Sequence, residues 1–136
     1  MRAVQLSPIP VPFRDDAVKV VEVRWGNGGA TFVEILSKRS GRRGRIEFGD
    51  DVGLRILSEL DLASMWMDAD REVLKATWLF EVHAGGWLEL ESTRSDFYTK
   101  HEAPVREFLI AGYQECVSVL SRQGPTVIEV TEDSNV

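Results

Sequence analysis

Residues 75–92 are K-A-T-W-L-F-E-V-H-A-G-G-W-L-E-L-E-S, two apolar runs on either side of Gly85 and Gly86. β-Branched and aromatic residues that flank a pair of glycines are typical of a β-hairpin. A two-residue loop would place glutamates on the same face as Phe80. A three-residue loop that starts at Ala84 puts His83 opposite Trp87, and it brings the apolar side chains of both strands to one face. We therefore predict the three-residue loop. The predicted buried face comprises Trp78, Phe80, Val82, Leu88 and Leu90.

The opposite face of this predicted hairpin is a candidate binding surface. It is polar apart from Leu79 and Trp87. An aromatic side chain ringed by polar groups is how interface hot spots are built. The interpretation as a surface cross-strand ladder, with His83 packed on Trp87, competes with a metal-binding or proton-transfer role for the group His83, Glu81 and Glu89. The candidate partner-binding residues are Glu81, His83, Trp87, Glu89 and Glu91, with Phe97 and Tyr98 from the following segment.

Composition predicts one domain, residues 1–136, that folds without a disulfide or a metal. The single cysteine, Cys116, cannot form an internal disulfide, and we expect a buried, reduced thiol in a cytoplasmic protein. We expect neither a signal peptide nor a membrane span. The net charge of −6 argues against general nucleic-acid binding, which needs a basic surface, and suits a basic protein partner.

The remaining chain has further strand signals. Alternate prolines in residues 1–16 hold the chain extended, which predicts an arm along a sheet edge or a loose tail, with a polyproline recognition motif as the alternative. Residues 17–25 and 31–38 predict a second hairpin across the glycine-rich loop 26–29. A third hairpin is predicted from 105–111 and 115–120, a last strand from 126–131 and a tail from 132–136. Residues 93–104 are expected to form a loop or a single helical turn.

Five basic residues fall within residues 38–45. Without them, 11 basic residues stand against 22 acidic ones, so the charge is strongly polarised. We expect a solvated, weakly held turn that is dispensable for folding. The alternative is an anion-binding cluster beside a small-ligand pocket, made of Arg39, Arg42, Arg43 and Arg45.

Residues 45–67 fit two structures after a short strand at 45–48. Val52, Ile56 and Leu60 have helical spacing, whereas Leu54 and Ile56 also fit an alternating strand. We prefer the helix, followed by a polar connection at 68–72.

Three segments carry a resemblance. They are F-G-D-D-V-G-L-R-I-L-S-E-L-D-L-A-S-M-W, G-G-W-L-E and E-F-L-I-A-G-Y-Q-E-C-V-S-V-L-S, within residues 46–121. Together they resemble small bacterial proteins of unassigned activity, some of which are similar to immunity proteins that neutralise a toxin partner. The resemblance assigns no functional residue.

Recognisable catalytic motifs are not found: there is no zinc-ligand spacing, no phosphate loop and no nucleophile elbow. We expect an α+β fold, predominantly antiparallel sheet built of consecutive hairpins, with one or two short helices and with no cofactor or metal. The predicted function is non-enzymatic binding of a protein partner, as in an immunity-type inhibitor that masks a basic partner. The alternative is a small-ligand-binding protein or enzyme. A sheet with exposed edges could also form a homodimer.

Overall fold

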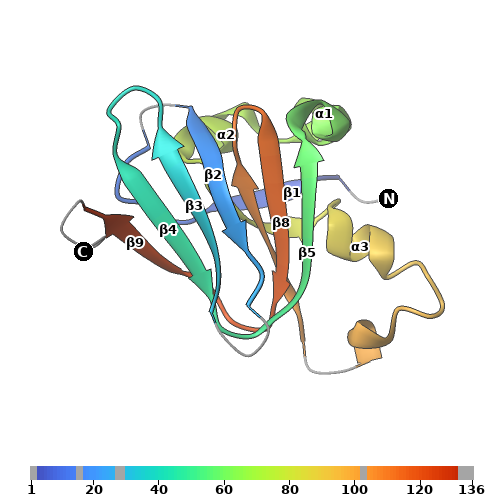
Figure 1. The fold of residues 1–136 in the computed structure, drawn as a ribbon. Helices are drawn as coiled ribbons and strands as arrows, with labels where there is room; N and C mark the ends of the chain where they lie inside the picture. The colour runs from blue at the N-terminus through green and yellow to red at the C-terminus, as the bar shows by residue number, and fades with distance from the viewer. Residues whose placement is uncertain (1–2, 15–16, 27–29, 102–103, 132–136) are drawn as a thin grey trace.

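The computed structural model describes residues 3–14, 17–26, 30–101 and 104–131, which form two antiparallel sheets (Figure 1). The five-stranded sheet has the order β1 (Gln5–Pro8), β6 (Leu79–Ala84), β7 (Arg106–Ala111), β8 (Glu115–Ser121), β5 (Asp51–Ser58). The four-stranded sheet has the order β2 (Val18–Arg24), β3 (Thr31–Ser37), β4 (Arg43–Phe48), β9 (Thr126–Val130). The helical elements are η1 (Glu59–Leu62), α1 (Ala63–Asp68), α2 (Arg71–Ala76), α3 (Trp87–Glu91) and η2 (Tyr98–His101). The predicted α+β class is confirmed.

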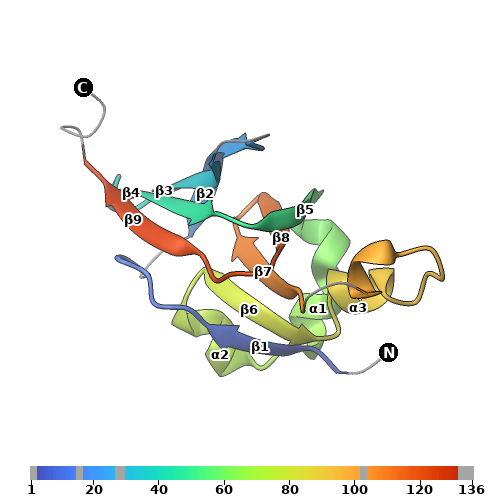
Figure 2. The ribbon, with the colours of Figure 1, turned by 90° about the horizontal axis from the view of Figure 1, so that it is seen from below.

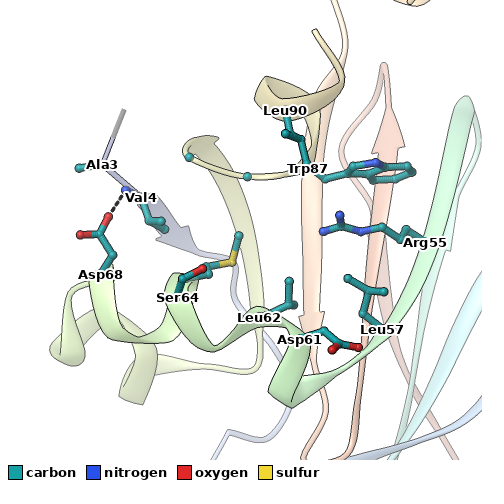
Figure 3. Close-up of a pocket in the computed structure, with 13 residues that line it drawn as sticks. Ala3, Val4, Arg55, Leu57, Asp61, Leu62, Ser64, Asp68, Trp87 and Leu90 are labelled. Carbon is teal, nitrogen blue, oxygen red and sulfur yellow. Dashed lines mark hydrogen bonds between the residues drawn. The ribbon is translucent and has the colours of Figure 1, made fainter. Parts of the chain in front are cut away.

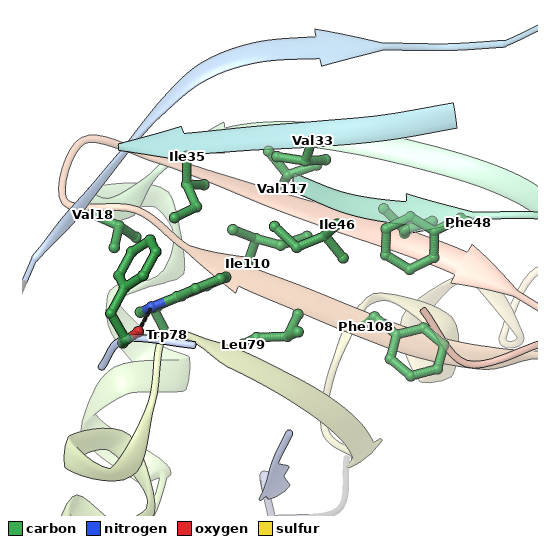
Figure 4. Close-up of a cluster of buried hydrophobic side chains, with 12 residues drawn as sticks. Val18, Val33, Ile35, Ile46, Phe48, Trp78, Leu79, Phe108, Ile110 and Val117 are labelled. Atoms are coloured by element: carbon green, nitrogen blue, oxygen red, sulfur yellow. Dashed lines mark hydrogen bonds between the residues drawn. The ribbon is translucent and has the colours of Figure 1, made fainter. Parts of the chain in front are cut away.

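The main core lies between the two sheets. Val33 and Ile46 of the four-stranded sheet meet Ile110 and Val117 of the five-stranded sheet, and all four are fully buried (Figure 4). Trp78 enters this core and donates its indole N–H to the carbonyl of Phe13 at 2.7 Å. The buried indole is therefore satisfied, as a polar group in an apolar core must be.

A smaller core lies on the other face of the five-stranded sheet, under α1 (Figure 2). Leu62 and Met65 pack there against Leu109 and Cys116. Cys116 is 1% exposed, as predicted for a buried free thiol, and burial raises its pKa to about 11. The five-stranded sheet is consequently buried on both faces.

The central hairpin prediction is wrong in its second half. β6 forms as expected, with Trp78, Phe80 and Val82 buried, but residues 87–91 form helix α3. Both edges of β6 are already occupied, by β1 on one side and β7 on the other. No edge remains for a strand after Gly85 and Gly86. Leu88 is therefore only half buried, and Leu90 is 52% exposed instead of in the core.

The predicted polar face of β6 is also wrong. Leu79 is fully buried, because the four-stranded sheet covers that face. Glu81, Glu89 and Glu91 were expected to be exposed, and each is half buried.

Residues 52–58 belong to strand β5, so the preferred helix is wrong there and the alternating-strand alternative holds. β5 pairs along its length with β8, and tertiary pairing overrides the helical spacing. The predicted polar connection at 68–72 contains instead the start of α2, whose N-cap is Asp70.

The second and third hairpins and the last strand are confirmed, and β1 confirms an arm along a sheet edge. A bulge between Val20 and Glu22 interrupts the pairing of β2 with β3, and Val21 there is 39% exposed. The tail at 132–136 and loop residues 27–29 lie outside the described residues.

The basic stretch is held more firmly than a solvated turn. Arg42 binds Glu129 through two hydrogen bonds of 2.7 Å and donates to the carbonyl of Pro12. Arg45 is paired with Glu34 and lies 4.3 Å from the ring centroid of Phe32. The expectation of a weakly held turn is wrong for these two arginines, since β3 and β9 bring carboxylates to them.

Phe80 is 1% exposed, and replacing it by alanine should leave a cavity in the five-stranded sheet. We expect Phe80→Ala to lower the free energy of unfolding by about 3–5 kcal/mol, measured by urea denaturation. Ile128→Ala, at a 43% exposed position of β9, is the control and should cost far less. Equal losses in the two variants would contradict this core assignment.

Candidate functional site

A cavity of about 650 Å³, which we call the main cavity, lies between β5, α1, α3 and the N-terminal arm (Figure 3). Leu57, Leu62 and Met65 supply an apolar wall. Asp61, Ser64 and Asp68 lie along the helical side, whereas Trp87 and Leu90 lie on the side of α3. The cavity thus combines an apolar interior with a polar rim, the usual composition of a ligand pocket.

Arg55 enters this cavity from β5, with its guanidinium under the ring of Trp87 (Figure 3). The guanidinium carbon lies 5.1 Å from the ring centroid, which is cation–π geometry. Gly53 makes this packing feasible, because a Cβ there would lie 3.2 Å from Trp87 Cη2. The indole N–H of Trp87 donates to Glu91 at 3.2 Å. The ring is therefore held by a hydrogen bond at its edge and by Arg55 against its face.

Arg55 lacks a hydrogen-bond acceptor. Its Nε is buried without a partner, and the guanidinium as a whole makes no hydrogen bond to any described residue. Burial lowers the pKa of Arg55, while the charges of Glu107 and Glu91 oppose that effect. A buried donor without a partner costs about 1–3 kcal/mol, so such a group needs an explanation, and a ligand is one.

Glu107 holds in place the segment of the cavity wall that begins at Gly86. It is 2% exposed, and it accepts hydrogen bonds from the backbone N–H groups of Trp87 at 3.1 Å and Leu88 at 2.8 Å. A Cβ on Gly86 would lie 2.8 Å from both Glu107 oxygens and 2.6 Å from Val82 Cγ1, so only glycine fits there. Burial raises the pKa of Glu107, and the two backbone hydrogen bonds partly offset this rise.

The predicted partner-binding residues do not form one face. Glu81 is paired with Arg106 by two hydrogen bonds of 2.8 Å, which lower the pKa of Glu81, and His83 Nε2 lies 2.7 Å from Ser7 Oγ. His83 and Glu89 line a smaller hollow of about 230 Å³. Tyr98 is 73% exposed, and Phe97 lies near Arg94. Of the predicted set, only Trp87 lines the main cavity.

The alternative anion site is divided as well. Arg42 and Arg45 are paired within the protein, whereas Arg39 and Arg43 are exposed. Arg45 lines an open hollow of about 390 Å³ beside Trp25. The arginine that faces the main cavity without an acceptor is Arg55, from a different strand.

Sequence reasoning missed Arg55 and Glu107. Arg55 is a single charge inside the apolar run G-L-R-I-L, and Glu107 follows Arg106 at the start of R-E-F-L-I-A. An ordinary strand with one face in solvent contains charged residues in the same pattern. Only the covering of both faces of the sheet distinguishes a charge held inside the protein from a charge on its surface.

Comparison with protein families, with curated proteins and with solved structures found no match to this chain. The described residues contain no group of three or more metal-ligating side chains. Among these residues, no helix is both long and apolar enough to cross a membrane.

The buried carboxyl of Glu107 should give a pH-dependent stability. Its folded-state pKa is raised above the ordinary value of 4.5 by burial. The folded protein then binds the proton more tightly than the unfolded chain, so this contribution is fully present below 4.5 and is lost as the pH rises through the raised pKa. In urea denaturation at a series of pH values, the wild type should lose stability over that interval relative to Glu107→Gln, which cannot ionise. Parallel pH profiles of the two proteins would contradict this assignment.

Proposed function

We propose that the protein is a non-enzymatic binding module for a basic protein partner, and that it docks through the rim of the main cavity. We call this surface the docking face and define it by Leu60, Asp61, Met67, Asp68 and Leu90. The observation that carries the proposal is the exposure of its three large apolar side chains: Leu60 is 78%, Met67 88% and Leu90 52% exposed. Apolar side chains that gather at a polar rim are typical of interaction sites.

Helical spacing supports the grouping of these residues. Leu60, Ser64 and Met67 are related by i, i+4 and i+7, so they share one side of the η1–α1 segment. Ser64 lines the cavity, as does Leu90 from α3. An apolar stripe on η1 and α1 therefore borders the cavity mouth, and Leu90 lies across it.

The charge of the rim supports a basic partner. Asp61 and Asp68 both line the cavity and are exposed. Asp61 forms no ion pair with any described residue, and Asp68 accepts one hydrogen bond, from the backbone N–H of Val4 at 2.9 Å. Carboxylates around an apolar patch attract a partner with lysine or arginine around its own apolar anchor.

The docking face replaces the hairpin face that the sequence predicts. Glu81 and Glu91 are paired with Arg106 and Arg94, so these acids are partly neutralised. Trp87 forms a wall of the cavity instead of projecting from the surface as an anchor. In this arrangement the partner supplies the anchor and the cavity mouth receives it.

An immunity-type inhibitor that masks the basic surface of a toxin is one protein of this kind, and the sequence resemblance points in that direction. A catalytic role for the thiol is not favoured, because burial raises the pKa of Cys116 to about 11 and keeps it protonated at neutral pH.

The proposal is tested by capturing partners from the native cell and by measuring the affinity of the protein recovered. We expect Leu60→Ser with Met67→Ser to weaken binding by about tenfold or more, since central apolar contacts carry most interface energy. Asp61→Lys should slow association, and its effect should shrink as salt rises.

Matched controls lie on the four-stranded sheet. Ile128→Ser removes another exposed apolar side chain, and Glu22→Lys reverses another exposed charge. Both should leave the affinity unchanged. Loss of binding in the controls but not in the docking-face variants would overturn the proposal.

A further inference from the structure

We propose that the interior of the main cavity is a binding site for a small organic monocarboxylate, whose carboxylate binds Arg55 and whose apolar body lies on Leu57, Leu62 and Met65. The site is distinct from the docking face, which lies at the rim. The carboxylate proposal depends on Arg55 and is tested without the partner, so either proposal can fail alone.

Arg55 is the residue that would bind the carboxylate of the ligand. Its guanidinium extends under Trp87 into the cavity (Figure 3), and it makes no hydrogen bond within the described chain. Two other arginines that contact an aromatic ring, Arg42 and Arg106, each pair with both oxygens of one carboxylate. Two parallel N–H donors match the two oxygens of a carboxylate, which is why arginine recognises that group so well.

Among the described residues that line the cavity, Arg55 is the one cation, and several acids lie around it. Glu107 and Glu91 act on Arg55 electrostatically, and Asp61 and Asp68 line the same cavity. A ligand with one negative charge balances Arg55. A phosphate ester with two negative charges would be repelled by the four acids, so the surroundings select a monoanion.

The volume and the lining of the cavity indicate the size and the polarity of the rest of the ligand. A volume of about 650 Å³ lies inside the range of small-molecule sites. The wall beside Arg55 is apolar: Leu57 extends from the same strand, and Leu62 and Met65 come from the η1–α1 segment. An aliphatic or aromatic body fits this wall, whereas a sugar would leave its hydroxyl groups without partners there. Such a carboxylate could belong to a free acid or to the C-terminus of a peptide.

The test uses phenylbutyrate as probe and phenylbutyramide as its uncharged match, with binding to the wild type measured by calorimetry. We expect saturable binding of the acid, at least about tenfold tighter than the amide, because only the acid forms charge-assisted hydrogen bonds with Arg55. Phenylbutyl phosphate should bind more weakly than phenylbutyrate. A tripeptide with an apolar last residue distinguishes a free acid from a peptide C-terminus as the natural ligand, and the same peptide with an amidated C-terminus is its control. Tighter binding of the tripeptide with a free C-terminus than of phenylbutyrate identifies a peptide C-terminus.

The variant Arg55→Met should abolish the preference for the acid, and Arg71→Met, which removes an exposed arginine from α2, should not. Absence of saturable binding by any acid, or equal affinity for acid and amide, would overturn the proposal. Should Arg55→Met not fold, the comparison of acid with amide on the wild type still decides the matter. None of these measurements involves the protein partner or the docking face.

Discussion

The structure around the candidate site depends on the carboxylate of Glu107. From the middle of the five-stranded sheet it accepts the first free N–H groups of α3, at Trp87 and Leu88. Gly86 brings the backbone close enough for this contact, because any side chain there would collide with the carboxylate. Those two hydrogen bonds turn the chain out of the sheet and into a short helix, and they place Trp87 over β5 at the side of the cavity.

That position of α3 follows from a second constraint, the number of sheet edges. β6 lies between β1 and β7, so its backbone donors and acceptors are already paired on both sides. A strand after Gly86 would have left its own backbone groups without partners on one edge. The helix bonds part of its backbone internally, and Glu107 accepts the N–H groups of Trp87 and Leu88. The N-terminal arm thus determines a helix that lies about eighty residues further along the chain.

The cavity exists because the elements around β5 do not close over it. α1 covers the face of the sheet above Leu109 and Cys116, and α3 lines the opposite side of the cavity with Trp87 and Leu90. Between them, Arg55 extends from the strand with an aromatic ring on one face and with no hydrogen-bond acceptor for its N–H groups among the described residues. A charged group in that situation is stable only with compensation, which the aromatic ring supplies in part and an anion would supply more fully.

The sequence by itself determined the elements whose pattern depends only on near neighbours. The hairpin across residues 26–29, the hairpin of β7 and β8, the strand β9, the buried thiol of Cys116 and the α+β class all follow from alternation and turn residues. Tertiary structure decided what depends on pairing and burial: that residues 52–58 form a strand along β8, that residues 87–91 form a helix, and that Arg55 lines a cavity whose Trp87 wall is held by Glu107. The physical reason is that local patterns show which faces of a segment are apolar. They do not show which strand edges are already paired, or which charged side chain is buried.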